Sequence, residues 1–163
     1  MEKILLDYFS GDELAASTWL KKYAYNDEQT PEDMHHRLAR EFAKIESRYP
    51  NPLSEEEIFE LFDHFKYVIP GGSVMSVLGT DMISSISNCV VIDSPSDSIS
   101  SIMDTCKDAA NLFKRRCGVG FDISKLRPNG ALVHNSAKES TGAASFMELF
   151  SCITETISQK GRR

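Results

Sequence analysis

One stretch, residues 87–122, constrains the fold more than any other part of this sequence. It begins with a short apolar run at 89–92, rich in β-branched residues, which favours a buried strand over a helix. From Asp97 onward, apolar residues recur three and four positions apart and predict an amphipathic helix that ends at the basic cluster 114–116. A second short run with two glycines follows at 118–121. Together these segments predict a strand–helix–strand unit with parallel strands and a right-handed crossover.

The residues before this unit predict helices. Thr30 and Ser54 each precede an apolar periodic segment and have an acidic residue three positions later, which is the pattern of a helix N-cap with a capping box. Pro70 and the two glycines after it interrupt the helical pattern and open a loop. We therefore expect an α+β or α/β chain, with an N-terminal helical bundle over residues 1–69 and a second domain over residues 70–163.

Charge and composition narrow the range of partners. The 163 residues carry a net charge of −6, and the acidic excess lies within residues 1–70, whereas the remainder is nearly neutral. This balance disfavours a nucleic-acid surface but permits a local phosphate site. The N-terminus is acidic, and no apolar run approaches the roughly 20 residues that span a bilayer. We expect a cytoplasmic chain without a membrane segment or secretory signal.

Cysteine and histidine spacing predicts no metal site. The four cysteines show neither a C-x-x-C nor a Cys/His ligand spacing, so in a reducing compartment we expect no structural disulfide. His35 and His36 are neighbours on a predicted helix and point in different directions, which disfavours shared metal binding. We expect both histidines at the surface or at its boundary.

The second part contains several short motifs in a fixed order: Ser87-Asn88-Cys89, Asp97-Ser98-Ile99, residues 114–122, residues 126–131, Asn135-Ser136-Ala137, Ser140-Thr141-Gly142 and residues 159–163. In this order and spacing, residues 70–163 resemble the start of the catalytic barrel in the large subunit of ribonucleotide reductase. The resemblance implies a ten-stranded α/β barrel. This sequence would hold the first strand–helix–strand units of it, so that an incomplete barrel follows the N-terminal helical bundle.

The resemblance implies a catalytic and substrate-binding role for four residues. Cys89 would be one of two thiols that reduce the ribose and become a disulfide, which a thioredoxin- or glutaredoxin-like dithiol then restores. Asn88 would contact the ribose of a ribonucleotide substrate, and Gly118 would let the substrate approach the backbone. Ser73 would touch the substrate phosphate. From the residues alone, Cys89 also fits an inert core thiol, and Ser73 a turn serine that bonds its own backbone.

The resemblance also implies an allosteric site for a deoxynucleoside triphosphate effector, formed by Asp97, Ser98, Ile99, Lys114 and Arg127. The chemistry agrees, because a carboxylate can accept a ribose hydroxyl while lysine and arginine hold phosphates. Asp97 could equally be a helix N-cap. Residues 127–136 resemble the family's first specificity loop, which lies at a homodimer interface.

The resemblance leaves part of the chemistry to another polypeptide. The chain stops before the family's radical-bearing cysteine and second reducing cysteine, and it lacks the N-terminal nucleotide-sensing domain. We therefore expect it to be inactive alone and to need a second chain, as in a split reductase. It most resembles adenosylcobalamin-dependent (class II) members, and a metal cofactor in a separate small subunit is the alternative. Two other functions stay open: a non-catalytic nucleotide-binding and assembly module, and an inactive truncated fragment.

Overall fold

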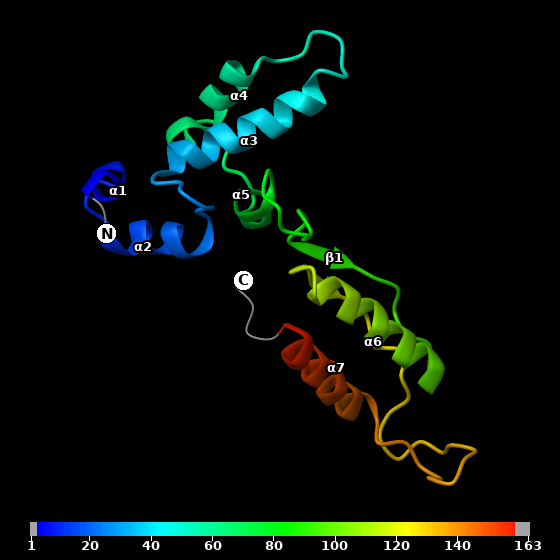
Figure 1. The fold of residues 1–163 in the computed structure, drawn as a ribbon. Helices are drawn as coiled ribbons and strands as arrows, with labels where there is room; N and C mark the ends of the chain where they lie inside the picture. Colours follow the sequence, from blue (N-terminus) through cyan, green and yellow to red (C-terminus); the bar gives the residue numbers. More distant parts are fainter. Residues whose placement is uncertain (1–2, 159–163) are drawn as a thin grey trace. The chain divides into compact units, whose positions relative to one another are not determined.

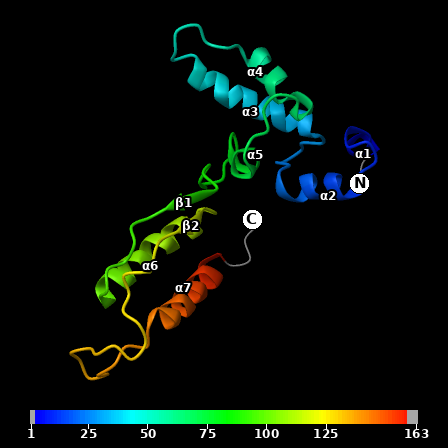
Figure 2. The same cartoon turned by 180° about the vertical axis from the view of Figure 1, so that it is seen from behind.

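A computed structural model describes residues 3–158 of the chain (Figures 1 and 2). The contacts between residues divide it into two compact units, Met1–Ile86 and Ser87–Arg163. The compact units thus divide after residue 86, while the domain boundary expected between residues 69 and 70 stays a prediction. The last motif of the resemblance, residues 159–163, lies outside the described residues.

The first unit is helical, and two of its helices begin where the capping patterns at Thr30 and Ser54 predict them. The loop expected to open after Pro70 is wrong, because a short helix begins at Gly72. The Ser54 hydroxyl accepts a hydrogen bond from the Glu57 N–H (3.1 Å), and the Glu57 carboxylate accepts one from the Ser54 N–H (2.7 Å). The Asp33 carboxylate accepts one from the Thr30 N–H in the same way (3.0 Å). The helices are α1 (Lys3–Tyr8), α2 (Glu13–Lys22), α3 (Pro31–Glu46), α4 (Glu55–Phe62), the 3₁₀ turn η1 (Asp63–Phe65) and α5 (Gly72–Val77).

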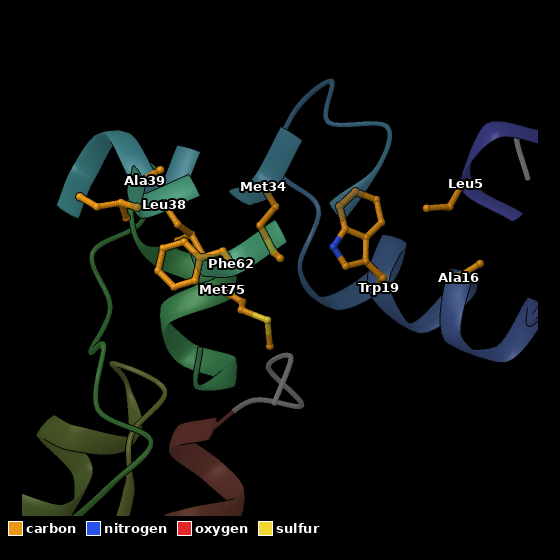
Figure 3. Packing of buried hydrophobic residues seen from close by; sticks show 9 residues of the cluster. Leu5, Ala16, Trp19, Met34, Leu38, Ala39, Phe62 and Met75 are labelled. Carbon is orange, nitrogen blue, oxygen red and sulfur yellow. The ribbon is translucent and has the colours of Figure 1, made fainter. Parts of the chain in front are cut away.

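The core of the first unit gathers around α3. Met34 and Leu38 from α3 are fully buried next to Phe62 from α4 (Figure 3). Trp19 from α2 and Met75 from α5 belong to the same cluster. Helices α1, α2, α4 and α5 have between 6 and 10 residues and are too short to be stable alone, so packing in this shared apolar cluster stabilises them.

A buried ion pair ties three segments of the first unit together. The Arg37 guanidinium on α3 lies 2.6 Å from the Glu28 carboxylate, and both side chains are about nine-tenths buried. The same guanidinium donates to the backbone carbonyls of Met75 (3.1 Å) and Leu78 at the C-terminal end of α5. Because several acceptors share one planar cation, the α2–α3 connection, α3 and α5 are fixed by a single side chain.

The expected surface position of His35 is wrong. Its ring is fully buried, and the Phe65 ring packs edge-on against it, with centroids 4.7 Å apart. The face of α3 explains the difference, since Leu38 and Ala39, three and four residues later, are core residues on the same side. The neighbouring His36 is exposed and stacks on Phe59. Among the described residues, no group of three His, Cys, Asp or Glu side chains could hold a metal ion.

The second unit contains the predicted strand–helix–strand segment. Strand β1 (Cys89–Val91), helix α6 (Ile99–Phe113) and strand β2 (Gly118–Gly120) follow one another, and the two strands pair in parallel. Helix α7 (Ala143–Ser158) lies beside α6 (Figures 1 and 2). Ile102 and Cys106 of α6 form a small core with Leu126, against which apolar side chains of α7 pack.

The short sheet is open. It has two strands in the described part of the chain, does not close on itself, and is consistent with an incomplete barrel. The sequence predicts a buried strand at 89–92, but the Val91 side chain is 84% exposed. A strand is buried on both faces only when layers cover both, and no described residue covers this side chain. In the same part of the chain, no helix is long and apolar enough to cross a membrane.

Candidate functional site

Cys89 begins strand β1 and is solvent-exposed, with a free thiol. Its partner in the parallel ladder is Gly118, the first residue of β2. The Gly118 N–H donates a 2.7 Å hydrogen bond to the carbonyl of Asn88, which fixes the two strand starts against each other. The structure therefore brings together three of the four residues expected at the substrate site.

The Cys89 sulfur lies directly over the backbone of Gly118. A Cβ atom built on Gly118 would be 3.0 Å from the Cys89 Sγ and 3.3 Å from the Asn88 carbonyl oxygen. Carbon atoms prefer separations of about 3.5–4.0 Å, and sulfur is larger than carbon. The sulfur thus occupies the space that a side chain at position 118 would need.

Cys89 and Cys152 are the exposed thiols among the four cysteines, all of which are free. Cys106 and Cys117 are buried, and burial raises the pKa of the Cys106 thiol. Since a thiolate is the reactive species, a buried thiol of raised pKa is poorly suited to exchange. Cys152 lies on α7, so it occupies an exposed helix face.

Ser73, the fourth residue expected at the substrate site, belongs to the first unit. It lies in the first turn of α5, and its carbonyl accepts a hydrogen bond from the Ser76 hydroxyl (3.3 Å). Its expected contact with a substrate phosphate stays a prediction.

Asp97 and Arg127 form an ion pair at the N-terminal end of α6. The Arg127 Nε lies 2.6 Å from one carboxylate oxygen of Asp97, and the Arg127 backbone N–H donates to the other (3.2 Å). These hydrogen bonds hold the pKa of the Asp97 carboxyl below its usual range. The Arg127 Nη1 also donates to the Leu132 carbonyl (2.9 Å), so the pair anchors the loop that follows.

Ser98, and not Asp97, is the N-cap of α6. Its hydroxyl accepts a hydrogen bond from the Ser101 N–H (3.2 Å), whereas the Asp97 carboxylate is directed to Arg127. The alternative of Asp97 as the helix N-cap is therefore wrong. Asp97 and Ser98 are adjacent in the chain, so one residue forms the ion pair while the next caps the helix.

An open groove of about 460 Å³ lies beside this helix end. Four of the five expected effector residues line it, namely Asp97, Ser98, Ile99 and Arg127. The first backbone N–H groups of a helix have no partners within the helix and favour an anion nearby. The groove therefore combines a cation, a carboxylate and a helix N-terminus.

Lys114, the fifth expected effector residue, lies at the opposite end of the same helix, where it is the C-cap. Lys114 and Ser98 are 16 positions apart on either side of α6, which corresponds to about 24 Å at a rise of 1.5 Å per residue. Within one copy of the chain, the structure does not bring Lys114 to the groove.

The opposite wall of the groove comes from the loop 133–141, of which the sequence analysis assigned residues 133–136 to the expected specificity loop and missed residues 137–141. His134, Glu139 and Ser140 are among the lining residues. The loop folds back because Gly142 adopts a left-handed backbone conformation (φ +82°) against Asn129, where a Cβ would approach the Asn129 nitrogen to 2.6 Å. Gly130 and Gly142, which lie on either side of this segment, were the features of the sequence that could have indicated the fold-back.

A second groove, of about 310 Å³, belongs to the first unit and matches no expected site. Its lining is almost entirely apolar and includes Phe9, Trp19, Tyr23, Phe65 and Met75.

Comparison with known proteins identifies the second unit. Residues 87–163 match the model of a family described as "Ribonucleotide reductase, barrel domain". The matched range begins two residues before Cys89 and includes both strands, α6, the groove and α7.

Relatives with established names agree with this match. A "Vitamin B12-dependent ribonucleoside-diphosphate reductase" of Thermoplasma acidophilum is 32% identical over 108 residues, which cover 66% of this chain and 13% of that protein. A protein of the same name from Mycobacterium tuberculosis is 30% identical over 159 residues, covering 92% of this chain and 22% of that protein. A "Ribonucleoside-diphosphate reductase subunit alpha" of Buchnera aphidicola is 29% identical over 120 residues, covering 72% and 15%.

The chain thus spans between 13% and 22% of the length of these three relatives. The family match and the names of the relatives agree with each other, and the open two-stranded sheet is consistent with both. This chain corresponds to a fragment of a ribonucleotide reductase large subunit, and its residues 87–163 belong to the barrel-domain family of that enzyme.

Proposed function

We propose that this chain supplies part of the reducing centre of a ribonucleotide reductase, with Cys89 as one of its two reducing thiols. The observation that supports this most directly is the placement of Cys89. It is an exposed, free thiol at the start of a strand, inside the segment that matches the barrel domain. A thiol sealed in the core could not have served as a reductant.

In the proposed reaction, two thiols reduce the 2′ carbon of a ribonucleotide. The C2′–O bond breaks and a C2′–H bond forms, the hydroxyl leaves as water, and the two sulfurs join in a disulfide. Cys89 contributes one of the two electrons and a second cysteine of the barrel the other. An external dithiol of the thioredoxin or glutaredoxin type reduces the disulfide by exchange. Because the cycle needs the external dithiol in its reduced form, we propose that it takes place in a reducing compartment such as the cytoplasm.

Three further residues are proposed to bind the substrate. Asn88 precedes Cys89 and is proposed to contact the ribose, and Gly118 lies opposite Cys89 in the ladder. Ser73 is proposed to contact a substrate phosphate. These three roles rest on the positions that match the family's motifs.

The groove at the N-terminal end of α6 is the proposed site of a deoxynucleoside triphosphate effector. Asp97, Ser98, Ile99 and Arg127 line it. A phosphate that binds Arg127 must compete with the Asp97 carboxylate, so effector binding would loosen the contact that anchors the loop. Since Lys114 lies at the far end of α6, it would have to reach an effector from a second copy of the chain in a homodimer.

The radical that starts the reaction must come from a cofactor, because no ordinary side chain supplies it. Neither of the two grooves described above fits adenosylcobalamin. Pockets of about 300–1,000 Å³ hold drug-sized ligands, a corrinoid is larger than those, and the two grooves measure about 460 and 310 Å³. We propose that adenosylcobalamin binds elsewhere in the enzyme, with a metal cofactor in a separate small subunit as the alternative.

The remaining catalytic residues are proposed to come from a second chain that carries the rest of the barrel, as in a split reductase. The test mixes the chain with the polypeptide of the same genome that carries the remaining barrel, and measures dithiol-driven ribonucleotide reduction. We expect turnover in the mixture and none from either chain alone. Cys89→Ser should abolish it, whereas Cys152→Ser, at the other exposed thiol, should not. Turnover that survives Cys89→Ser would refute the role of that thiol.

A second function, a non-catalytic nucleotide-binding module, is favoured by the groove itself. It predicts that deoxynucleoside triphosphates bind this chain while no mixture shows turnover. Turnover in the reconstituted mixture separates this module from the reductase, and equilibrium dialysis with the wild type and Arg127→Gln separates it from an inactive fragment. Loss of binding in the variant without turnover in any mixture would support the module, whereas an inactive fragment would bind nothing.

A further inference from the structure

We infer that Gly118 is a positioning residue for the Cys89 thiol, because the absence of a side chain at position 118 leaves the space that the sulfur occupies. The inference rests on the proposed reducing role of Cys89. It differs from the substrate contact assigned to Gly118 above, since here the glycine acts through the sulfur and need not touch the substrate.

The first step is the direct contact across the ladder. Cys89 and Gly118 are register partners in the parallel pair, so position 118 lies beside position 89. A Cβ at 118 would be 3.0 Å from the Cys89 Sγ. This is well inside the normal separation of about 3.5–4.0 Å for two carbon atoms, which are smaller than sulfur.

The second step is that the methyl group of an alanine could not move aside. The Asn88 carbonyl oxygen is 3.3 Å from the same Cβ position, and it is held there by the 2.7 Å hydrogen bond from the Gly118 N–H. Backbone atoms limit the methyl on that side. The Cys89 side chain, by contrast, is exposed and can rotate about its Cα–Cβ bond. We therefore expect the sulfur to move and the backbone to remain.

The third step is that the structure provides a matched control. Gly120 occupies the same strand two residues later, on the same face of the sheet, and is the register partner of Val91. A Cβ at 120 would be 3.9 Å from the Val91 Cγ2, which is an ordinary contact. Gly120→Ala thus adds the same methyl group to the same strand without displacing a neighbour.

The consequence for catalysis follows from the geometry that a reducing thiol needs. A sulfur that rotates away from β2 no longer occupies the position set by the two strand starts. Misplacement of a reacting atom by about 1 Å can cost about 10²-fold in rate. Gly118→Ala should therefore lower kcat in the reconstituted enzyme and leave KM unchanged, whereas loss of a substrate contact at Gly118 would raise KM.

The experiment compares Gly118→Ala with Gly120→Ala in the full chain. The Hα–Hβ coupling constants of Cys89, measured by NMR, report the rotamer of its side chain. Peptide-resolved labelling of Cys89 by a small aromatic disulfide, measured against pH, reports the rate of thiol–disulfide exchange. We expect Gly118→Ala to change the couplings and to raise the exchange rate several-fold, because the sulfur turns toward solvent. Gly120→Ala should match the wild type in both measurements.

Couplings and exchange rates that are the same in both variants would overturn the inference. So would a changed rotamer with unchanged kcat in a reconstituted enzyme that Cys89→Ser inactivates, a result that leaves the proposed function intact. Failure of the proposed function has a different signature, which is turnover that survives Cys89→Ser. The coupling and exchange measurements need no partner chain, so they decide the sulfur's position in either case.

Discussion

The buried imidazole of His35 should make the first unit acid-sensitive. Its ring is fully buried, neither ring nitrogen has a hydrogen-bond partner among the described residues, and burial lowers its pKa from 6.5 to about 4. In the unfolded chain the ring is protonated below pH 6.5, whereas in the folded chain it stays neutral down to about pH 4. The unfolded state therefore binds more protons between these values. Stability is complete above pH 6.5 and is lost as the pH falls.

The magnitude follows from the two pKa values. Each unit of pKa difference corresponds to about 1.4 kcal/mol, so the free energy of unfolding at pH 4.5 should be about 2–3 kcal/mol lower than at pH 7.5 from His35 alone. Other groups also titrate in this range. The difference between the wild type and His35→Leu isolates the contribution of the ring, because the leucine has a similar size and no proton to bind.

Urea denaturation at the two pH values provides the assay, followed by the fluorescence of Trp19. This is the single tryptophan of the chain, and it is 3% exposed in the same core. We expect the wild type to lose about 2–3 kcal/mol more than His35→Leu on acidification. His36→Leu, which removes a histidine from the exposed side of the same helix, should behave like the wild type. Equal losses in the wild type and His35→Leu would refute the reasoning.

Three further predictions concern contacts outside the reducing site. Arg37→Met strands the buried carboxylate of Glu28 and should cost about 3–5 kcal/mol in urea denaturation, and a loss below 1 kcal/mol would contradict the buried pair. Gly142→Ala should lower the melting temperature more than Gly130→Ala, because both glycines have positive φ but only the first would press a methyl against backbone. Asp97→Asn removes the ion pair with Arg127, whose guanidinium also holds the Leu132 carbonyl, so proteolysis of the loop after Arg127 should accelerate. In the wild type the pKa of the Asp97 carboxyl is lowered and the pair weakens as the pH falls, so the proteolysis rate should rise with acid in the wild type but not in the variant.

The local features of the fold could be predicted from the sequence. The helix starts at Thr30 and Ser54 depend on side chains within three residues of the cap. The parallel strands around α6 follow from two apolar runs and one change of period, which also lie close together in the sequence. Such signals are physical properties of a short segment, so they survive in the tertiary structure.

The features that the sequence analysis missed depend on distant residues. His35 seemed to be a surface residue because it stands beside His36, but its burial is decided by α4 and η1, which pack on that face of α3. The groove wall at 133–141 required knowledge that Gly142 folds back onto Asn129. Lys114 was grouped with Asp97 by resemblance, whereas the straight length of α6 keeps the two ends of that helix apart.

The contact between Cys89 and Gly118 has a consequence for how such a sequence can change over time. Two positions separated by 28 intervening residues share one small volume, so a sulfur held in its present position at the first requires the smallest residue at the second. We therefore expect the two residues to change together in related sequences, although nothing in the linear order of the gene links them.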